Sequence, residues 1–295
     1  MGYTRSEMAD GGRKAGFGDV SERLVTDWAG MGLLDQADRV GRGKGGGTGA
    51  RYEWPDNQLD LFLALLSKRS QVKRVQGLCV IPVAVWLYLG TNAVPLRQAR
   101  VTLQTWWQAA GEVGRLGRSQ KAARVVVDAF APKSRSDTKT RLREAVSDSI
   151  FQGRFDGAQI LPLVSKLLQD TQHGTWGPFA FTPNETVRGM QAMVEAINRY
   201  NELDDEIFEA VRERQRYSMH LYMRDYPQLV RHPTFGSWFE NPDLQFLFNN
   251  SCHHLLLGLG LTLLSLDEGA QLQPIPSIQW RTPFWDGPTF MNEQL

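Results

Sequence analysis

The sequence predicts a mainly α-helical protein with a small amount of β-structure near its N-terminus. Three observations predict this fold class. Apolar residues recur at helical spacing over most of the chain. A glycine-rich segment at 41–49 separates the first helical pattern from a short alternating one. Beyond Ser70 the strand patterns fade, so we expect an all-helical body.

The composition is that of an ordinary globular protein. A chain of 295 residues is long enough for two domains at about 150 residues each. Apolar residues make up 42% and charged residues 22%, and the formal charge of +1 points to no particular partner. The longest apolar stretches, 78–90 and 255–266, are shorter than the ~20 residues of a membrane span, and residues 1–19 do not resemble a secretory signal. We therefore expect a soluble cytoplasmic protein whose Cys79 and Cys252 are reduced and buried.

The first well-defined helix is predicted at 20–34. Its apolar face consists of Val20, Leu24, Val25 and Trp28. Asp19 or Ser21 is expected to cap its start, because a side-chain oxygen there satisfies the first N–H groups. Gly30 and Gly32 mark its end.

A strand and a second helix are predicted after the glycine-rich segment. The alternating residues 51–54 suit a strand, and Pro55-Asp56 suits a helix start. The apolar positions of this helix are Leu59, Phe62, Leu63 and Leu66.

The remaining patterns predict helices up to a proline-rich tail. Residues 78–90 are interrupted by Pro82 and predict a buried kinked helix or two short ones. Pro95 begins the next helix, and the longest periodic segment, 185–226, slips in phase near Asn201. The other predicted helical ranges are 138–151, 159–169 and 244–266, and the tail begins at Gln273. We expect two domains, residues 1–75 and residues 76–295.

The elements before residue 70 resemble one known arrangement. The matching residues are Val20-Ser21 with Arg23-Leu24-Val25, Trp28, Gly32-Leu33-Leu34, Arg51-Tyr52 and Trp54, preceded by Tyr3-Thr4 and Glu7-Met8-Ala9. Together they resemble the winged helix-turn-helix of the MerR family of DNA-binding regulators. The resemblance implies a second helix that enters the major groove and a loop that forms a wing on the DNA backbone.

The residue types at these positions independently suit DNA binding. A recognition helix needs short polar or basic side chains near its N-terminal end, where base edges and phosphates are within reach. Basic side chains in and beside a flexible loop suit contacts to phosphates. The predicted DNA-binding residues are Ser21, Arg23, Thr26, Arg39, Arg42, Lys44, Arg51 and Tyr52.

No motif predicts an enzyme, a metal site or a cofactor. Lys44 is followed by Gly45 rather than Ser or Thr, and no hydrophobic strand precedes it, which argues against a phosphate-binding loop. Neighbouring residues on a helix point about 100° apart, so Cys252, His253 and His254 are expected to pack in the core rather than share a metal ion. We expect no catalytic residues, no metal ligands and no cofactor.

Three features allow two interpretations each. The segment from 97 to 143 contains eleven Lys or Arg residues and only three acidic residues. Arg115, Arg118, Lys121 and Arg124 recur there at three-residue spacing, and they form either a second DNA-backbone contact or a solvated face paired with acids such as Asp204, Asp205, Glu206 and Glu209. Residues 185–226 form either a dimerisation helix or core helices. The aromatic side chains of the C-terminal third either line an effector pocket or fill the core.

The sequence thus predicts a DNA-binding regulator of transcription whose partner is double-stranded DNA. A palindromic operator needs a two-fold protein, so we expect a homodimer whose helical body also senses a small-molecule effector. The alternative is a protein-interaction module, or a plasmid or phage maintenance factor, on the same fold. Four acids around the first helix favour this alternative: Glu22, Asp27, Asp35 and Asp38.

Overall fold

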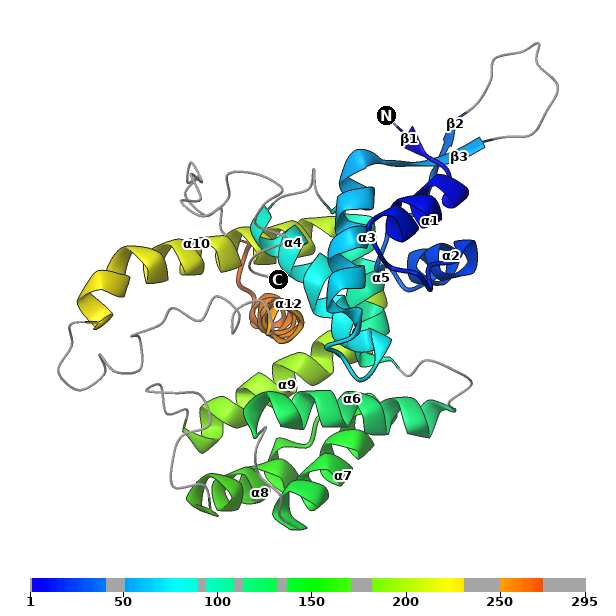
Figure 1. Cartoon of the computed structure of the whole chain (residues 1–295). Helices are drawn as coiled ribbons and strands as arrows, with labels where there is room; N and C mark the ends of the chain where they lie inside the picture. The colour runs from blue at the N-terminus through cyan, green and yellow to red at the C-terminus, as the bar shows by residue number, and fades with distance from the viewer. Residues whose placement is uncertain are drawn as a thin grey trace. The chain divides into compact units, whose positions relative to one another are not determined.

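This computed structural model describes residues 2–40, 51–89, 94–108, 114–131, 137–170, 182–230 and 250–272 (Figure 1). It confirms the predicted fold class, because helices dominate and a three-stranded antiparallel sheet lies near the start of the chain. Two compact units are present. The described residues of the first fall within 2–106 and 250–252, and those of the second within 107–230 and 253–272. The first unit extends beyond residue 75, where we predicted a domain boundary; that boundary stays a prediction.

The first unit begins with two short helices and the small sheet. Its elements are β1 (Gly2–Tyr3), α1 (Arg5–Lys14), α2 (Glu22–Gly30), β2 (Asp38–Val40), β3 (Arg51–Pro55) and α3 (Asp56–Arg69), followed by η1 (Val75–Cys79), α4 (Val80–Leu89) and α5 (Leu96–Trp107). The strands are ordered β1-β3-β2, and both pairs are antiparallel. Helix α1 packs against α2 and α3.

Local capping explains where α1 and α2 begin. Thr4 and Glu7 form a reciprocal capping box at the start of α1, which satisfies two N–H groups that have no partner within the helix. Of the two predicted caps of α2, Ser21 fills the role, and its Oγ accepts a hydrogen bond from the Leu24 N–H at 3.3 Å. Both helices therefore begin at residues whose side chains replace missing backbone partners.

Helix α2 ends at Gly30, four residues before the predicted end. The reason is Gly32, whose φ of +75° turns the chain out of the helix. A Cβ at Gly32 would lie 2.6 Å from the Thr102 backbone nitrogen, so this turn passes close to α5.

Two prolines stand where helices begin. The sequence places Pro55 in the first turn of a helix, and in the structure it is the N-cap of α3, directly before the first helical residue. Pro82 is the third residue of α4, where proline is tolerated because the N–H groups of the first turn have no partner within the helix. The apolar stretch therefore forms two short elements, η1 and α4, which is the second of the two predicted alternatives.

Large apolar side chains from α1, α2, β3 and α3 form the core of the first unit. Trp28 and Phe62 meet edge to face, with ring centroids 5.4 Å apart. Other side chains of this core are Met8, Val25, Leu33, Leu34, Trp54 and Leu65. The first residue of α12 (Ser251–Asp267) is also tied to this unit, because the Ser251 Oγ donates a hydrogen bond to the Val80 carbonyl oxygen at 2.9 Å.

The second unit is helical throughout its described residues. It contains α6 (Arg115–Phe130), α7 (Asp137–Gln152), α8 (Gly157–Asp170), α9 (Pro183–Asn198), η2 (Tyr200–Glu202), α10 (Asp205–Val230) and the part of α12 (Ser251–Asp267) from residue 253 onward. Consecutive helices from α6 to α9 pack on one another, and α9 also packs against α6. A Cβ on Gly260 of α12 would overlap the Ala192 carbonyl group, so α12 and α9 are in backbone contact there.

The long periodic segment predicted at 185–226 forms two helices rather than one. The break at η2 coincides with the predicted phase slip near Asn201. Helix α9 buries Met190, Met193 and Val194 inside its own unit, as a core helix does. Within the described ranges, no helix is both long enough and apolar enough to cross a membrane.

Candidate nucleic-acid interface

Helix α2 is divided into a buried side and an exposed polar side. Val25 and Trp28 are almost completely buried, and they fix the helix against the core of the first unit. The exposed side begins at the N-cap and carries Ser21, Arg23 and Thr26. These are the three residues predicted to contact bases or phosphates. Arg23 and Thr26 share the exposed side of the helix, whereas Ser21 is its N-cap and its Oγ accepts from the Leu24 N–H.

Arg23 is the most accessible of these residues, because its side chain is 90% exposed. Its Nε lies 3.7 Å from the Asp27 Oδ2 one helical turn later, which is an exposed and therefore weak ion pair. Thr26 donates its hydroxyl proton to the Glu22 carbonyl oxygen at 3.2 Å. Arg23 is thus free to reach a ligand at little cost, whereas Thr26 presents mainly its oxygen and methyl group.

The antiparallel pair of β2 and β3 carries the predicted wing residues. Arg39 and Tyr52 lie directly opposite each other, and both are exposed. Arg39 forms no ion pair with any described residue, and the Tyr52 side chain is 55% exposed. Arg42 and Lys44 lie outside the residues that the structure describes, as does the whole glycine-rich segment.

Arg51 is already engaged by acids of the first unit. Its Nε lies 2.6 Å from the Glu53 Oε1, and its Nη2 lies 3.5 Å from the Glu7 Oε2. Hydrogen bonds from Thr4, and to a smaller extent Arg51, hold the pKa of Glu7 below its usual value. Arg51 therefore orders the strand and α1, and only part of its guanidinium is available to a ligand.

Sequence reasoning missed a buried polar network that fixes the segment between α2 and β2. The Gln58 Oε1 accepts from the Asp35 N–H at 2.8 Å, and the Gln58 Nε2 donates to the Gln98 Oε1 at 2.9 Å. The Gln98 Nε2 donates in turn to the Leu33 carbonyl oxygen at 3.0 Å. The available signal is that Gln58 and Gln98 stand among apolar residues on the buried sides of their helices.

Two of the acids that counted against DNA binding share one arginine in this part of the structure. Arg97 of α5 forms a two-pronged contact to the buried Asp35 carboxylate, with its Nε 2.8 Å from Oδ1 and its Nη2 2.7 Å from Oδ2. The same Nη2 lies 3.3 Å from the Asp38 Oδ1. These carboxylates raise the pKa of Arg97, and its single positive charge offsets one of their two negative charges. Glu22 and Asp27 are the exposed acids of α2.

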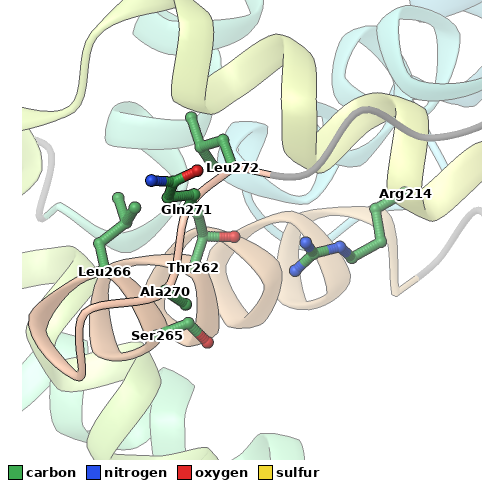
Figure 2. Close-up of a pocket in the computed structure, with 7 residues that line it drawn as sticks. All are labelled: Arg214, Thr262, Ser265, Leu266, Ala270, Gln271 and Leu272. Atoms are coloured by element: carbon green, nitrogen blue, oxygen red, sulfur yellow. The ribbon is translucent and has the colours of Figure 1, made fainter.

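A cavity of about 260 Å³ lies in the second unit, between α10 and the end of α12 (Figure 2). Arg214 reaches toward it from α10, and it carries the one charge among the lining residues. The Thr262 and Ser265 hydroxyls each donate to a carbonyl oxygen of their own helix. The other lining residues are Leu266, Ala270, Gln271 and Leu272. No aromatic side chain lines this cavity, so the predicted aromatic effector pocket stays a prediction.

The Cys-His-His run at the start of α12 is packed in the protein. Burial raises the pKa of Cys79 to about 12 and raises that of Cys252 well above its usual value, so both thiols are protonated at neutral pH. Burial lowers the pKa of His253 and of His254 to about 4, which keeps both imidazoles neutral. The described residues contain no group of three or more His, Cys, Asp and Glu arranged to bind a metal ion.

Comparison with known proteins identifies no relative: no family model, no curated protein and no solved structure matches this chain.

Proposed function

We propose that this protein is a cytoplasmic, sequence-specific DNA-binding regulator of transcription that resembles the MerR type and acts as a homodimer. The observation that carries the proposal is the polar side of α2. Arg23 and Thr26 project from a helix whose other side is locked into a core by Trp28. A helix held in this way is already fixed before DNA binds, so it can place its exposed side chains in the major groove without a further folding step.

The strand pair β2–β3 supports the same proposal. Arg39 and Tyr52 form an exposed cross-strand pair, and a guanidinium beside a phenol hydroxyl can contact neighbouring phosphates. Arg97 offsets one of the two negative charges of Asp35 and Asp38, which lessens their repulsion of DNA. In this proposal α2 reads base edges, whereas the strand pair sets the register on the backbone.

The proposed dimer follows from the small number of base pairs that one recognition helix can read. One recognition helix reads only a short half-site, and two-fold proteins read palindromes with half-sites about 34 Å apart. The proposal therefore requires a second copy of this chain on the same duplex.

Selection from a random duplex library with the full chain, at low and high salt, tests the proposal. An enriched two-fold motif is the expected result. Arg23→Ala should relax specificity at one position per half-site and cost about 1–3 kcal/mol of binding free energy. Arg39→Ala should weaken all duplexes alike and reduce the salt dependence of log Kd by about one unit.

Arg51→Ala and Arg69→Ala complete the design. Arg51→Ala also releases Glu7 and Glu53, so its loss of affinity should exceed that of Arg39→Ala. Arg69 is exposed at the end of α3 and serves as the matched control. Binding that is unselective and indifferent to Arg23 and Arg39 contradicts the proposal.

The second candidate function is protein interaction, including a plasmid or phage maintenance role, on the same fold. Its specific support is the exposed pair of acids, Glu22 and Asp27, on the side of α2 that would face DNA. Carboxylates beside phosphates are unfavourable, and Asp27 offsets the charge of Arg23. Glu22→Gln with Asp27→Asn separates the two functions, because this variant should bind DNA more tightly and a protein partner more weakly.

A further inference from the structure

A turn at the end of α12 builds one wall of the cavity in the second unit (Figure 2). Gly269 adopts a φ of +86°, and its N–H donates to the Leu266 carbonyl oxygen at 2.9 Å. The Ala270 N–H donates to the Ser265 carbonyl oxygen, also at 2.9 Å. This turn directs residues 270–272 back along α12, and α10 contributes the other side of the cavity.

Arg214 brings to this cavity a guanidinium that forms no ion pair with a described residue. Its neighbours on α10 each pair with an acid three residues earlier. Arg212 lies 2.9 Å from Glu209, and Arg216 lies 3.0 Å from Glu213. The residues three and four positions before Arg214 are apolar, so α10 supplies it with no such partner.

The two acids at the end of α12 are engaged by other arginines. The Asp267 Oδ2 lies 2.7 Å from the Arg199 Nη1, directly after α9. The Glu268 Oε1 lies 3.0 Å from the Arg188 Nη2, on α9 itself. Arg214 therefore carries a positive charge at the cavity that neither of these nearby carboxylates offsets.

The α12 side of the cavity offers hydrogen-bond acceptors. The Thr262 hydroxyl donates to the Gly258 carbonyl oxygen and the Ser265 hydroxyl to the Leu261 carbonyl oxygen, both at 2.9 Å. Because their protons are used in this way, both hydroxyl oxygens present lone pairs to a ligand. The C-terminal end of a helix also carries a partial negative charge, which favours a cation and opposes a doubly charged anion.

We propose that this cavity binds a small aliphatic amino acid in its zwitterionic form. The carboxylate of the ligand accepts two parallel hydrogen bonds from Arg214, and its ammonium group donates to the Thr262 and Ser265 oxygens. Its side chain packs against Leu266 and Leu272. The cavity volume of about 260 Å³ equals that of about nine water molecules, which suits a ligand of about nine non-hydrogen atoms. The inference concerns the second unit alone and does not rest on DNA binding.

A matched set of ligands tests which chemical groups the cavity recognises. L-Leucine and L-valine carry both charges, 4-methylpentanoate lacks the ammonium group of leucine, and 3-methylbutylamine lacks its carboxylate. Ligand-observed NMR measures Kd of each ligand for the full chain. Inorganic phosphate is added as a competitor, because it also pairs with a guanidinium but carries no apolar part.

Three variants of the full chain locate the binding site. Arg214→Gln and Ser265→Ala each remove one proposed contact, and neither side chain is buried. Arg154→Gln is the matched control, because Arg154 is exposed in the same unit and does not line the cavity. Circular dichroism checks that all three variants are folded.

The expected result is binding that needs both charged groups of the ligand. The wild-type chain should bind L-leucine with a Kd below about 1 mM, and each analogue that lacks one charge at least about tenfold more weakly. Arg214→Gln should raise the Kd of L-leucine about tenfold or more, Ser265→Ala about threefold to tenfold, and Arg154→Gln less than about twofold. Arg214→Gln should not weaken the binding of 3-methylbutylamine, which has no carboxylate.

Four results would each overturn this inference. The first is no saturable binding of L-leucine or L-valine up to about 10 mM. The second is an equal Kd for L-leucine and its two analogues, because apolar packing alone would then explain binding. The third is displacement of L-leucine by an equal concentration of phosphate, which would make this a site for inorganic anions. The fourth is an equal loss in Arg214→Gln and Arg154→Gln, which would show an effect of general charge.

Discussion

Replacement of Gln98 by alanine should loosen the first unit while leaving the second intact. Gln98 is almost completely buried on α5, and its amide joins the Leu33 carbonyl oxygen to the Gln58 side chain at 3.0 and 2.9 Å. The Gln98→Ala variant removes the hydrogen bond that each of these buried partners forms with Gln98. Each such loss costs about 1–3 kcal/mol, so we expect the unfolding free energy of this unit to fall by about 3 kcal/mol.

Hydrogen exchange followed by mass spectrometry measures this loss separately for each unit. A decrease of about 3 kcal/mol corresponds to amide exchange roughly 150-fold faster in peptides from α2 and α3, if these amides exchange through opening of the whole unit. Peptides from α7 should exchange at the wild-type rate. Gln104→Ala is the matched control, because Gln104 lies on the same helix, is only half-buried and forms no side-chain hydrogen bond with a described residue.

The reasoning is refuted if Gln98→Ala and Gln104→Ala give the same exchange rates within about threefold, since a difference that small is under 1 kcal/mol. Such a result would mean that water or rearranged side chains replace the lost hydrogen bonds. The network would then be a consequence of the fold of the first unit rather than a cause of it.

Three further predictions concern backbone contact and protonation. Gly32→Ala should lower the unfolding free energy by about 2 kcal/mol or more, because the positive φ of Gly32 and the nearby Thr102 backbone both oppose a Cβ. Gly30→Ala is the control and should be neutral or slightly stabilising, and urea unfolding measures both variants. Gly260→Ala should disrupt the packing of α12 on α9, and native-state proteolysis should cleave the second unit faster than in wild type. His253 and His254 titrate near pH 4 when folded and near 6.5 when unfolded, so the unfolded chain binds more protons between these values and stability falls as pH is lowered. Each histidine should cost about 1 kcal/mol between pH 7.5 and 5.5, and replacement of both by Gln should flatten urea midpoints measured across that range.

Local signals in the sequence were sufficient to place most helix boundaries. Ser21 marks a helix start through its side-chain hydrogen bond, and Pro55 marks one through its restricted backbone. The slip in apolar phase near Asn201 marks the break between α9 and α10. Such features act within one or two helical turns, so they are visible without knowledge of the fold. The predicted end of α2 was wrong by four residues, because Leu33 and Leu34 continue the apolar pattern after Gly32 has ended the helix.

The polar part of the first unit could not be predicted because its partners are distant in sequence. Arg97 looked like one charge of a basic segment, yet it pairs with Asp35, 62 residues earlier. Lys139 was counted in the same segment and is buried beside Asp128. Of the four residues at three-residue spacing, Arg115, Arg118 and Arg124 are exposed, whereas Lys121 is half-buried. Among the predicted DNA-binding residues that the structure describes, Arg51 is the one that internal acids engage most closely.

The hydrogen bond from Ser251 to Val80 has a consequence for how the protein is made in the cell. The two residues are 171 positions apart, so the first unit cannot be completed until most of the chain has left the ribosome. At roughly 5–20 residues per second, α4 waits about ten to thirty seconds for its last partner. During that interval its apolar side chains are incompletely covered, so the nascent chain is exposed to aggregation, and slower translation lengthens this exposure.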